Sequence, residues 1–217
     1  MAVVQPAPKP APVFEADAKH PVARLAELHR EAEETARLAN LLGRSIHAAV
    51  ALPLLAAATL MAGGVDPAES AAWMVFILAG SAAIGFCWRR TIAQPFERVA
   101  LRSFSQDLSA ILVFLGFAWG AGAFLVLPAD TSIGIVVLFA AGAGAVLTLL
   151  LRERECVFLF LAPTAALASF ACVLRPLGGG ALDAAFVLIA CIAVAGAAGL
   201  TGMRGARSTD LPEFLSA

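Results

Sequence analysis

The side chains able to support catalysis or bind a metal are few and lie far apart in the sequence. The three histidines, His20, His29 and His47, all precede the first long apolar run or lie at its start. The four cysteines have no CxxC spacing and lie within or at the ends of apolar runs: Cys87, Cys156, Cys172 and Cys191. A thiol in such surroundings usually behaves as a small hydrophobic group, so neither a disulfide framework nor a zinc site is predicted.

Known catalytic motifs are missing as well. The sequence holds no HExxH, no Ser/His/Asp constellation and no glycine loop that joins a strand to a helix around a phosphate. The prediction is therefore a protein that is not an enzyme and has no catalytic, cofactor-binding or metal-binding residues. His47 is a candidate proton sensor because imidazole titrates near neutral pH, although a single interfacial histidine is more often simply solvated.

Ionisable residues inside a membrane usually mark functional sites because they are costly to bury, and this sequence has none in the middle of an apolar run. Asp107 is expected just before or in the first turn of the third run, where a carboxylate suits the positive end of a helix. Arg175 and Asp183 flank an external loop. All three are interpreted as capping or snorkelling groups in preference to an ion relay.

The elements that must position these residues are apolar helices. Of the 217 residues, 60% are hydrophobic and 14% are charged, and the mean hydropathy is +0.86. Soluble domains have about 45–50% apolar residues and about 25% charged residues. Each run is long enough to span a bilayer and lacks the alternation of a barrel strand. The six charge-free runs are 46–63, 71–88, 108–127, 133–151, 156–174 and 184–203. The predicted fold is thus all-α, a polytopic integral membrane protein.

Three further segments complete the predicted domain organisation. Residues 1–21 are proline-rich and read as a disordered tail without the features of a secretory signal. Residues 22–45 predict an amphipathic helix, cytoplasmic or interfacial, whose apolar stripe rests on the membrane surface or on the protein's own loops in preference to a coiled-coil seam. The six-helix membrane domain covers 46–203, and 204–217 form a short cytoplasmic tail.

The short loops predict three antiparallel hairpins. With the N-terminus in the cytoplasm, 14 of the 15 Lys and Arg residues fall on the cytoplasmic side and only Arg175 falls outside. The positive-inside rule then places both termini in the cytoplasm. Trp73 and Trp88, at opposite ends of the second span, have the spacing of interfacial anchors.

Small residues predict where the helices pack. The third span contains a GxxxG motif and the fourth reads AAGAGA, and such faces let backbones approach closely. Packing inside one bundle is favoured over a dimer interface. Proline in the fifth span, with Pro53 as a weaker counterpart in the first, predicts a kink. The helix-packing candidates are Gly116, Trp119, Gly120, Gly142, Gly144 and Pro163.

The order of these features resembles a known class of membrane region. A charged lead-in helix, six spans, FAWGAGAFLVLP at 117–128, AAGAGAVLTLL at 140–150 and FLFLAPTAAL at 158–167 resemble the sensor regions that precede diguanylate cyclase, phosphodiesterase or histidine kinase domains in bacteria. In those regions the last helix continues into an output domain, whereas here 14 residues follow the sixth span. The resemblance implies an input module that acts through a partner, contacted through Arg204, Arg207 and the LPEFL segment.

Two main functional hypotheses follow. The first is a signal-input or regulatory module that acts through a cytoplasmic protein. The second is a structural or assembly subunit of a larger membrane complex, and a small transporter is less favoured because mid-membrane charge and matched broken helices are missing. The expected partners are the lipid bilayer and a protein. Nucleic acid is excluded because the net charge is −1.

The distribution of cations yields a topology that can be tested. Reporter fusions after residues 66, 130 and 178 should report the external side, and fusions after 95, 153 and 210 the cytoplasm. An external signal at 95 or 153 would be incompatible with six spans in this orientation.

Overall fold

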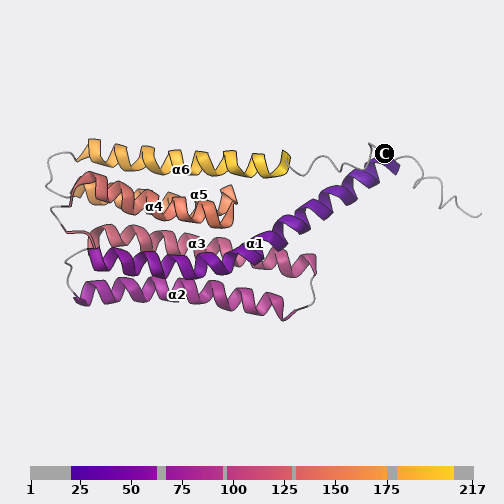
Figure 1. The fold of residues 1–217 in the computed structure, drawn as a ribbon, viewed down its shortest axis with the longest axis horizontal. Coiled ribbons are helices and arrows are strands. Elements are labelled where there is room, and N and C mark those ends of the chain that lie inside the picture. Colours follow the sequence, from indigo (N-terminus) through magenta and orange to yellow (C-terminus); the bar gives the residue numbers. More distant parts are fainter. Residues whose placement is uncertain (1–20, 63–66, 95–96, 129–130, 175–179, 208–217) are drawn as a thin grey trace, which may run out of the picture. The chain divides into compact units, whose positions relative to one another are not determined.

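The structure, a computed structural model, describes residues 21–62, 67–94, 97–128, 131–174 and 180–207. In these ranges the regular structure is helical (Figure 1), and each helix is long and apolar enough to cross a membrane. The predicted all-α, multi-pass architecture is confirmed at this level. Residues 1–20, Arg175 and residues 208–217 lie outside the described part, so the proline-rich tail, one candidate residue and most of the short C-terminal tail are not covered. The helices are α1 (Pro21–Ala62), α2 (Pro67–Ile92), α3 (Arg98–Leu125), α4 (Ile133–Leu151), α5 (Arg154–Leu174) and α6 (Ala181–Arg207).

Helix α1 differs from the sequence-based expectation of a lead-in helix over 22–45 and a separate first span over 46–63. Both segments belong to one continuous helix. The only glycine near the expected boundary is Gly43, and one glycine costs a helix only about 1 kcal/mol. The chain nevertheless divides into two compact units within this helix, Met1–Arg37 and Leu38–Ala217.

The first unit is described from Pro21 onward and is the polar part of α1. Its apolar side chains Leu25 and Leu28 are 66% and 55% exposed. Local contacts along the helix stabilise it: Nε2 of His29 lies 3.0 Å from Oε1 of Glu33, and the Thr35 hydroxyl donates to the carbonyl of Glu31 at 2.8 Å. Such contacts at i,i+4 spacing support a helix without requiring a partner.

The second unit is built around α3 and α5. These two helices form the most extensive contact of the unit; α3 also packs against α2, and α5 also packs against α4 and α6. Helices α3 and α4 follow each other in the chain but share only a small contact, while α4 packs more fully on α6. The packing therefore does not reduce to three successive hairpins.

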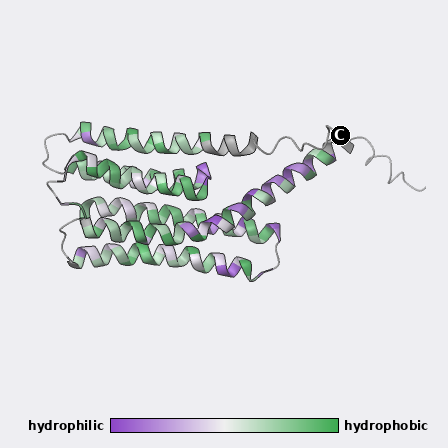
Figure 2. Cartoon of the chain, in the orientation of Figure 1, coloured by the Kyte–Doolittle hydropathy of each residue, from purple (hydrophilic) through white to green (hydrophobic). Residues whose placement is uncertain are grey.

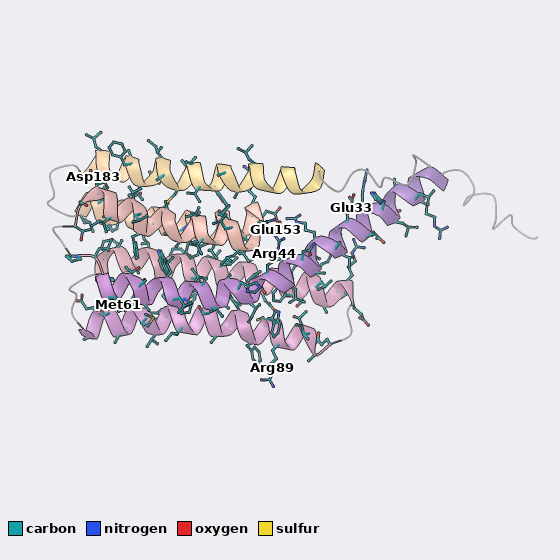
Figure 3. The ribbon with its side chains drawn as sticks, viewed as in Figure 1. Glu33, Arg44, Met61, Arg89, Glu153 and Asp183 are labelled. Atoms are coloured by element: carbon teal, nitrogen blue, oxygen red, sulfur yellow. The ribbon has the colours of Figure 1, made fainter. Side chains whose placement is uncertain are left out.

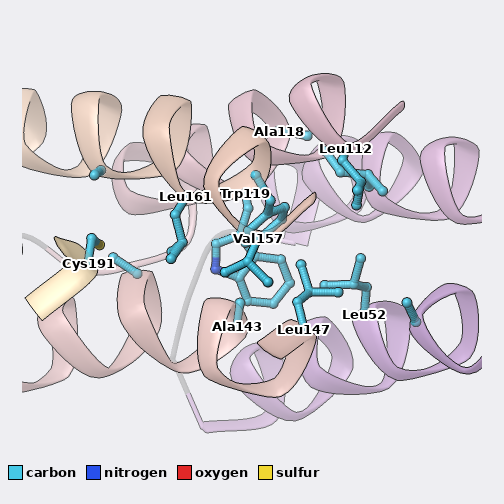
Figure 4. Close-up of a cluster of buried hydrophobic side chains, with 14 of the residues drawn as sticks. Leu52, Leu112, Ala118, Trp119, Ala143, Leu147, Val157, Leu161 and Cys191 are labelled. Carbon is cyan, nitrogen blue, oxygen red and sulfur yellow. The ribbon is translucent and has the colours of Figure 1, made fainter. Parts of the chain in front are cut away.

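The centre of the second unit is apolar and fully buried. Leu52 of α1, Leu112 and Trp119 of α3, and Leu147 of α4 meet in one cluster (Figure 4). The outward faces of α2 to α6 are also apolar (Figure 2), with many large hydrophobic side chains exposed. An apolar surface on both sides is typical of a bundle whose solvent is lipid.

The helices of the second unit end at different heights, as the hydrogen bonds between them show. Thr164 of α5 lies level with Gly116 of α3, because its hydroxyl bonds to that carbonyl. From this level, α3 extends 18 residues toward its N-terminal end at Arg98, whereas α5 extends ten residues toward its N-terminal end at Arg154. At 1.5 Å per residue, α3 extends about 12 Å farther. The bond between Trp119 and Phe139 gives about the same difference between α3 and α4.

The turn between α4 and α5 is therefore recessed at this end. Trp73 is level with Ala118, so α2 reaches as far as α3. Ser169 is level with Ala184, so α6 also continues about 12 Å past the turn. Figure 3 shows that Arg44, Arg89 and Glu153 lie toward this end, and that Met61 and Asp183 lie toward the other.

Arg152 forms the recessed turn in an unfavourable backbone conformation. It is the C-cap of α4 with φ 54° and ψ 22°, and its N–H donates to the carbonyl of Thr148 at 3.2 Å. Glycine usually occupies this left-handed position, because a Cβ there costs about 1 kcal/mol.

Arg152→Gly should therefore raise the stability of the purified protein by about 0.5–1 kcal/mol in an uncharged detergent. Arg152→Ala removes the same side chain but keeps the Cβ, so it should bring no gain. Thermal unfolding of the two variants measures the difference. Equal effects of glycine and alanine would mean that the backbone at this turn is unstrained.

Candidate functional site

Among the described glycines of the second unit, the closest approach to the backbone of another helix joins α3 to α5. A Cβ on Gly116 would collide with the carbonyl oxygen of Phe160 and with the ring of Pro163. A Cβ on Gly120 would lie 2.8 Å from Cβ of Leu167 and 3.1 Å from Cα of Thr164. Both glycines of the GxxxG motif thus face α5. We call the contact formed by Gly116, Gly120, Pro163, Thr164 and Leu167 the α3–α5 seam.

A hydroxyl group at the centre of this seam bonds across it. Thr164 is fully buried, and its Oγ1 lies 3.0 Å from the carbonyl oxygen of Gly116 and 2.8 Å from that of Phe160. The hydroxyl has one proton, so the two carbonyls share it. Pro163, the preceding residue, lacks an N–H and leaves one carbonyl of α5 without its helical donor. The seam therefore combines close packing with an interhelical hydrogen bond.

Two indole groups connect the neighbouring helices to α3. Trp73 of α2 is fully buried and donates from Nε1 to the carbonyl of Ala118 at 2.8 Å. Trp119 of α3 is 1% exposed and donates from Nε1 to the carbonyl of Phe139 in α4 at 2.9 Å. The prediction that Trp73 is an interfacial anchor is wrong: its ring lies inside the bundle, since the start of α2 packs against α3. Trp88 at the other end of α2 is half-buried.

The two tryptophans belong to one aromatic cluster. The ring of Trp119 stacks on Phe139, with centroids 5.2 Å apart and planes at 18°, and lies 5.4 Å from the ring of Trp73. Phe160 completes the cluster at 6.4 Å from Trp119. Gly122 makes room for it, because a Cβ there would lie 2.7 Å from the indole of Trp73 and 2.8 Å from the ring of Phe139. Aromatic pairs in this range contribute about 0.5–1.5 kcal/mol beyond burial.

The glycines of α4 differ from each other. A Cβ on Gly144 would collide with the side chain of Leu161 in α5, so Gly144 lies in a helix contact. Gly142 does not: a Cβ there would meet only Cδ1 of Leu138, in its own helix, at an ordinary 3.7 Å. Residues two positions apart on a helix are rotated by about 200° relative to each other, so the two glycines cannot share a face.

The ionisable candidates lie away from the seam. His47 is exposed on α1. Asp107 is exposed too, but the expectation that it begins the third helix is wrong, because α3 starts at Arg98 and Asp107 lies in its third turn. The helix includes 98–106, a segment of mixed polar and apolar residues that precedes the charge-free run. Within the part of the chain that the structure describes, no three His, Cys, Asp or Glu side chains come together to bind a metal.

Sequence reasoning missed three members of this arrangement. Trp73 was assigned to the interface from its position near the start of a span. Thr164 and Gly122 were overlooked, although a hydroxyl directly after a proline and a third glycine two residues after GxxxG were visible signals. What the sequence could not give is the rotation of each helix, which decides whether such a residue faces a neighbour or lipid.

Comparison with known protein-family models, curated proteins and solved structures finds no match for this chain. The function must therefore be argued from the geometry. The polar atoms described above, two indole N–H groups and one hydroxyl, all bond to backbone carbonyls of neighbouring helices. The arrangement is suited to fixing helix positions relative to one another.

The seam predicts opposite outcomes for two identical substitutions. Gly116→Ala forces α3 and α5 apart and should cost about 1–3 kcal/mol of stability, the usual range for overpacking. Gly142→Ala meets only an ordinary contact and should be neutral or slightly stabilising, since alanine favours the helix. Thermal unfolding in detergent measures both. A loss at Gly142 as large as that at Gly116 would show that the tight contact is not confined to the seam.

Proposed function

We propose that this protein is a membrane-embedded signal-input or regulatory module that acts through a cytoplasmic protein partner and catalyses no reaction itself. The observation that best supports this proposal concerns α3. This helix runs without interruption from the seam, deep in the bundle, to a charged end that extends about 12 Å beyond the α4–α5 turn. One helix thus connects the tightest internal contact to a surface outside the hydrocarbon.

The packing supports such coupling. α3 is held on three sides, by Trp73 of α2, by Phe139 of α4 through Trp119, and by Thr164 of α5. A change in the spacing of these helices must move α3 because packed interiors hardly compress. Its projecting turns are themselves well packed, with Leu101 and Phe104 buried, so they move as part of the helix.

The projecting end also offers apolar surface for a partner. Ile92 at the end of α2 and Val99 at the start of α3 are 48% and 76% exposed. By the register above, Val99 lies about 10 Å beyond the level of the α4–α5 turn. Exposed aliphatic side chains at such a distance from the apolar runs gain little from lipid and suit a protein contact.

The proposed orientation follows from charge. The end with Arg89, Arg90 and Arg152 faces the cytoplasm under the positive-inside rule, which also puts both termini there. The resemblance to sensor regions of bacteria makes a bacterial inner membrane the proposed location. Successive helices then cross in opposite directions, as in the predicted three hairpins, with the N-terminal half of α1 on the cytoplasmic side.

A second candidate function is assembly into a larger membrane complex, favoured by the open face of α6. This helix is the least buried of the six, and large apolar side chains cover its outer face. They are Leu182, Phe186, Leu188, Ile189, Ile192 and Leu200. Lipid covers such a face equally well, so the input module remains the main proposal.

Purification of the full chain from its own membranes in mild detergent separates the two functions. The input module predicts co-purification of a cytoplasmic signalling enzyme whose activity changes when the chain is added in vesicles. The double variant Ile92→Asp and Val99→Asp should weaken that binding at least tenfold, because two charges enter an apolar contact. Glu69→Ala, an exposed change at the opposite end, is the matched control.

A stoichiometric complex with integral membrane subunits, unaffected by Ile92→Asp and Val99→Asp, would support assembly and reject the input module. An enzyme that binds without any change in its activity would also reject regulation.

A further inference from the structure

Arginines with no ion pair surround one end of the second unit. The set has five members, of which Arg44 is half-buried and the other four are exposed. Among the described residues, none of the five arginine side chains forms a salt bridge. The opposite end carries Glu69 and Asp183 and no described cation. We call this set the basic rim: Arg44, Arg89, Arg90, Arg152 and Arg154.

The height of the rim matches the headgroup layer of a bilayer. The level of Arg154 corresponds to Gln106 on α3, two residues before the charge-free run 108–127, and to Gly85 on α2. The hydrocarbon boundary therefore fits this level. Arg89 and Arg90 lie about 6–8 Å beyond it along α2, and the headgroup layer extends about 5–8 Å beyond the hydrocarbon.

The side chains next to these arginines are those of a membrane interface. Phe86, at the boundary, is 69% exposed, and Trp88 is half-buried one turn away from the end of α2. Aromatic rings favour this depth, and an arginine can extend its guanidinium along such a surface to reach a phosphate.

The distribution of the rim favours lipid over a protein. The backbone of α2, which carries Arg89 and Arg90, packs against α3 and not against the backbones of α4 or α5 in the described residues. Its contact with α4 is between the rings of Trp73 and Phe139, at the end of α2 away from these arginines. Arg152 is thus on a different side of the bundle from Arg89. A protein partner would cover one side, whereas lipid headgroups reach every side.

Carboxylates near the rim reduce its charge without neutralising it. Asp107 and Arg90 both lie within electrostatic range of the thiol of Cys87, and they form no salt bridge with each other. Glu153 and Glu155 flank Arg154 and have interactions of their own. The excess of arginine remains largest on α2.

We propose that the basic rim binds anionic phospholipid headgroups, with Arg89 and Arg90 at the end of α2 as its strongest phosphate contacts. Guanidinium groups pair well with phosphate oxygens. A basic side chain near an anionic surface strengthens binding about fivefold. This inference does not depend on the proposed signalling function.

Native mass spectrometry of the full chain in uncharged detergent tests the proposal, with phosphatidylglycerol and phosphatidylcholine as probes. The unmodified chain should bind phosphatidylglycerol at least tenfold more tightly. The double variant Arg89→Gln and Arg90→Gln should weaken phosphatidylglycerol binding about 20-fold and leave phosphatidylcholine unchanged. Lysine at both positions keeps the charge and should retain most of the affinity.

A matched pair of carboxylate variants tests the direction of the effect. Asp107→Asn should tighten phosphatidylglycerol binding about fivefold, whereas Glu69→Gln at the other end should leave it unchanged. Equal affinity for the two lipids, or no effect of the glutamine variants in a chain that unfolds at the usual temperature, would overturn the proposal. Displacement of phosphatidylglycerol by millimolar inorganic phosphate, at constant ionic strength, would show a soluble-anion site and overturn it too.

Discussion

Helices in lipid cannot rely on the hydrophobic effect to hold them together, because lipid tails are as apolar as the side chains. Close backbone contact and interhelical hydrogen bonds must supply the attraction. This chain concentrates both at the α3–α5 seam, where Gly116 and Gly120 let the backbones meet and Thr164 bonds to the Gly116 carbonyl. The other helices of the second unit attach to this pair: α2 to α3, and α4 and α6 mainly to α5 and to each other.

The aromatic cluster meets a second requirement: a buried indole N–H needs an acceptor, because burying it without a partner is costly. Helical carbonyls retain a second lone pair, and Trp73 and Trp119 use it on Ala118 and Phe139. The geometry depends on Gly122, which leaves space for the rings of Trp73 and Phe139. Glycine and tryptophan are therefore interdependent here, and neither residue type alone would have indicated the contact.

The sequence was informative where physical chemistry acts along the chain. Runs without charge located the six helices, and GxxxG indicated a packing face. It was uninformative where the outcome depends on helix rotation: AAGAGA contains Gly142 and Gly144, and only Gly144 meets another helix. Helix ends were also hidden, because the segment 98–106, which mixes charged, polar and apolar residues, extends α3 beyond the charge-free run.

Because the helices differ in length, a tilt at the seam moves their ends at the basic rim by different distances. The 18 residues between Gly116 and Arg98 form a lever about 27 Å long. A tilt of about 5° at the seam would move its end by about 2 Å, which is comparable to the helix shifts of 1–2 Å seen in known switching proteins. From Thr164, α5 extends only ten residues, or about 15 Å, to the α4–α5 turn, so the same tilt would move this turn by about 1 Å. A small tilt at the seam would therefore move the end of α3 about twice as far as the recessed turn, and the bond from Trp73 would pass part of this movement to α2.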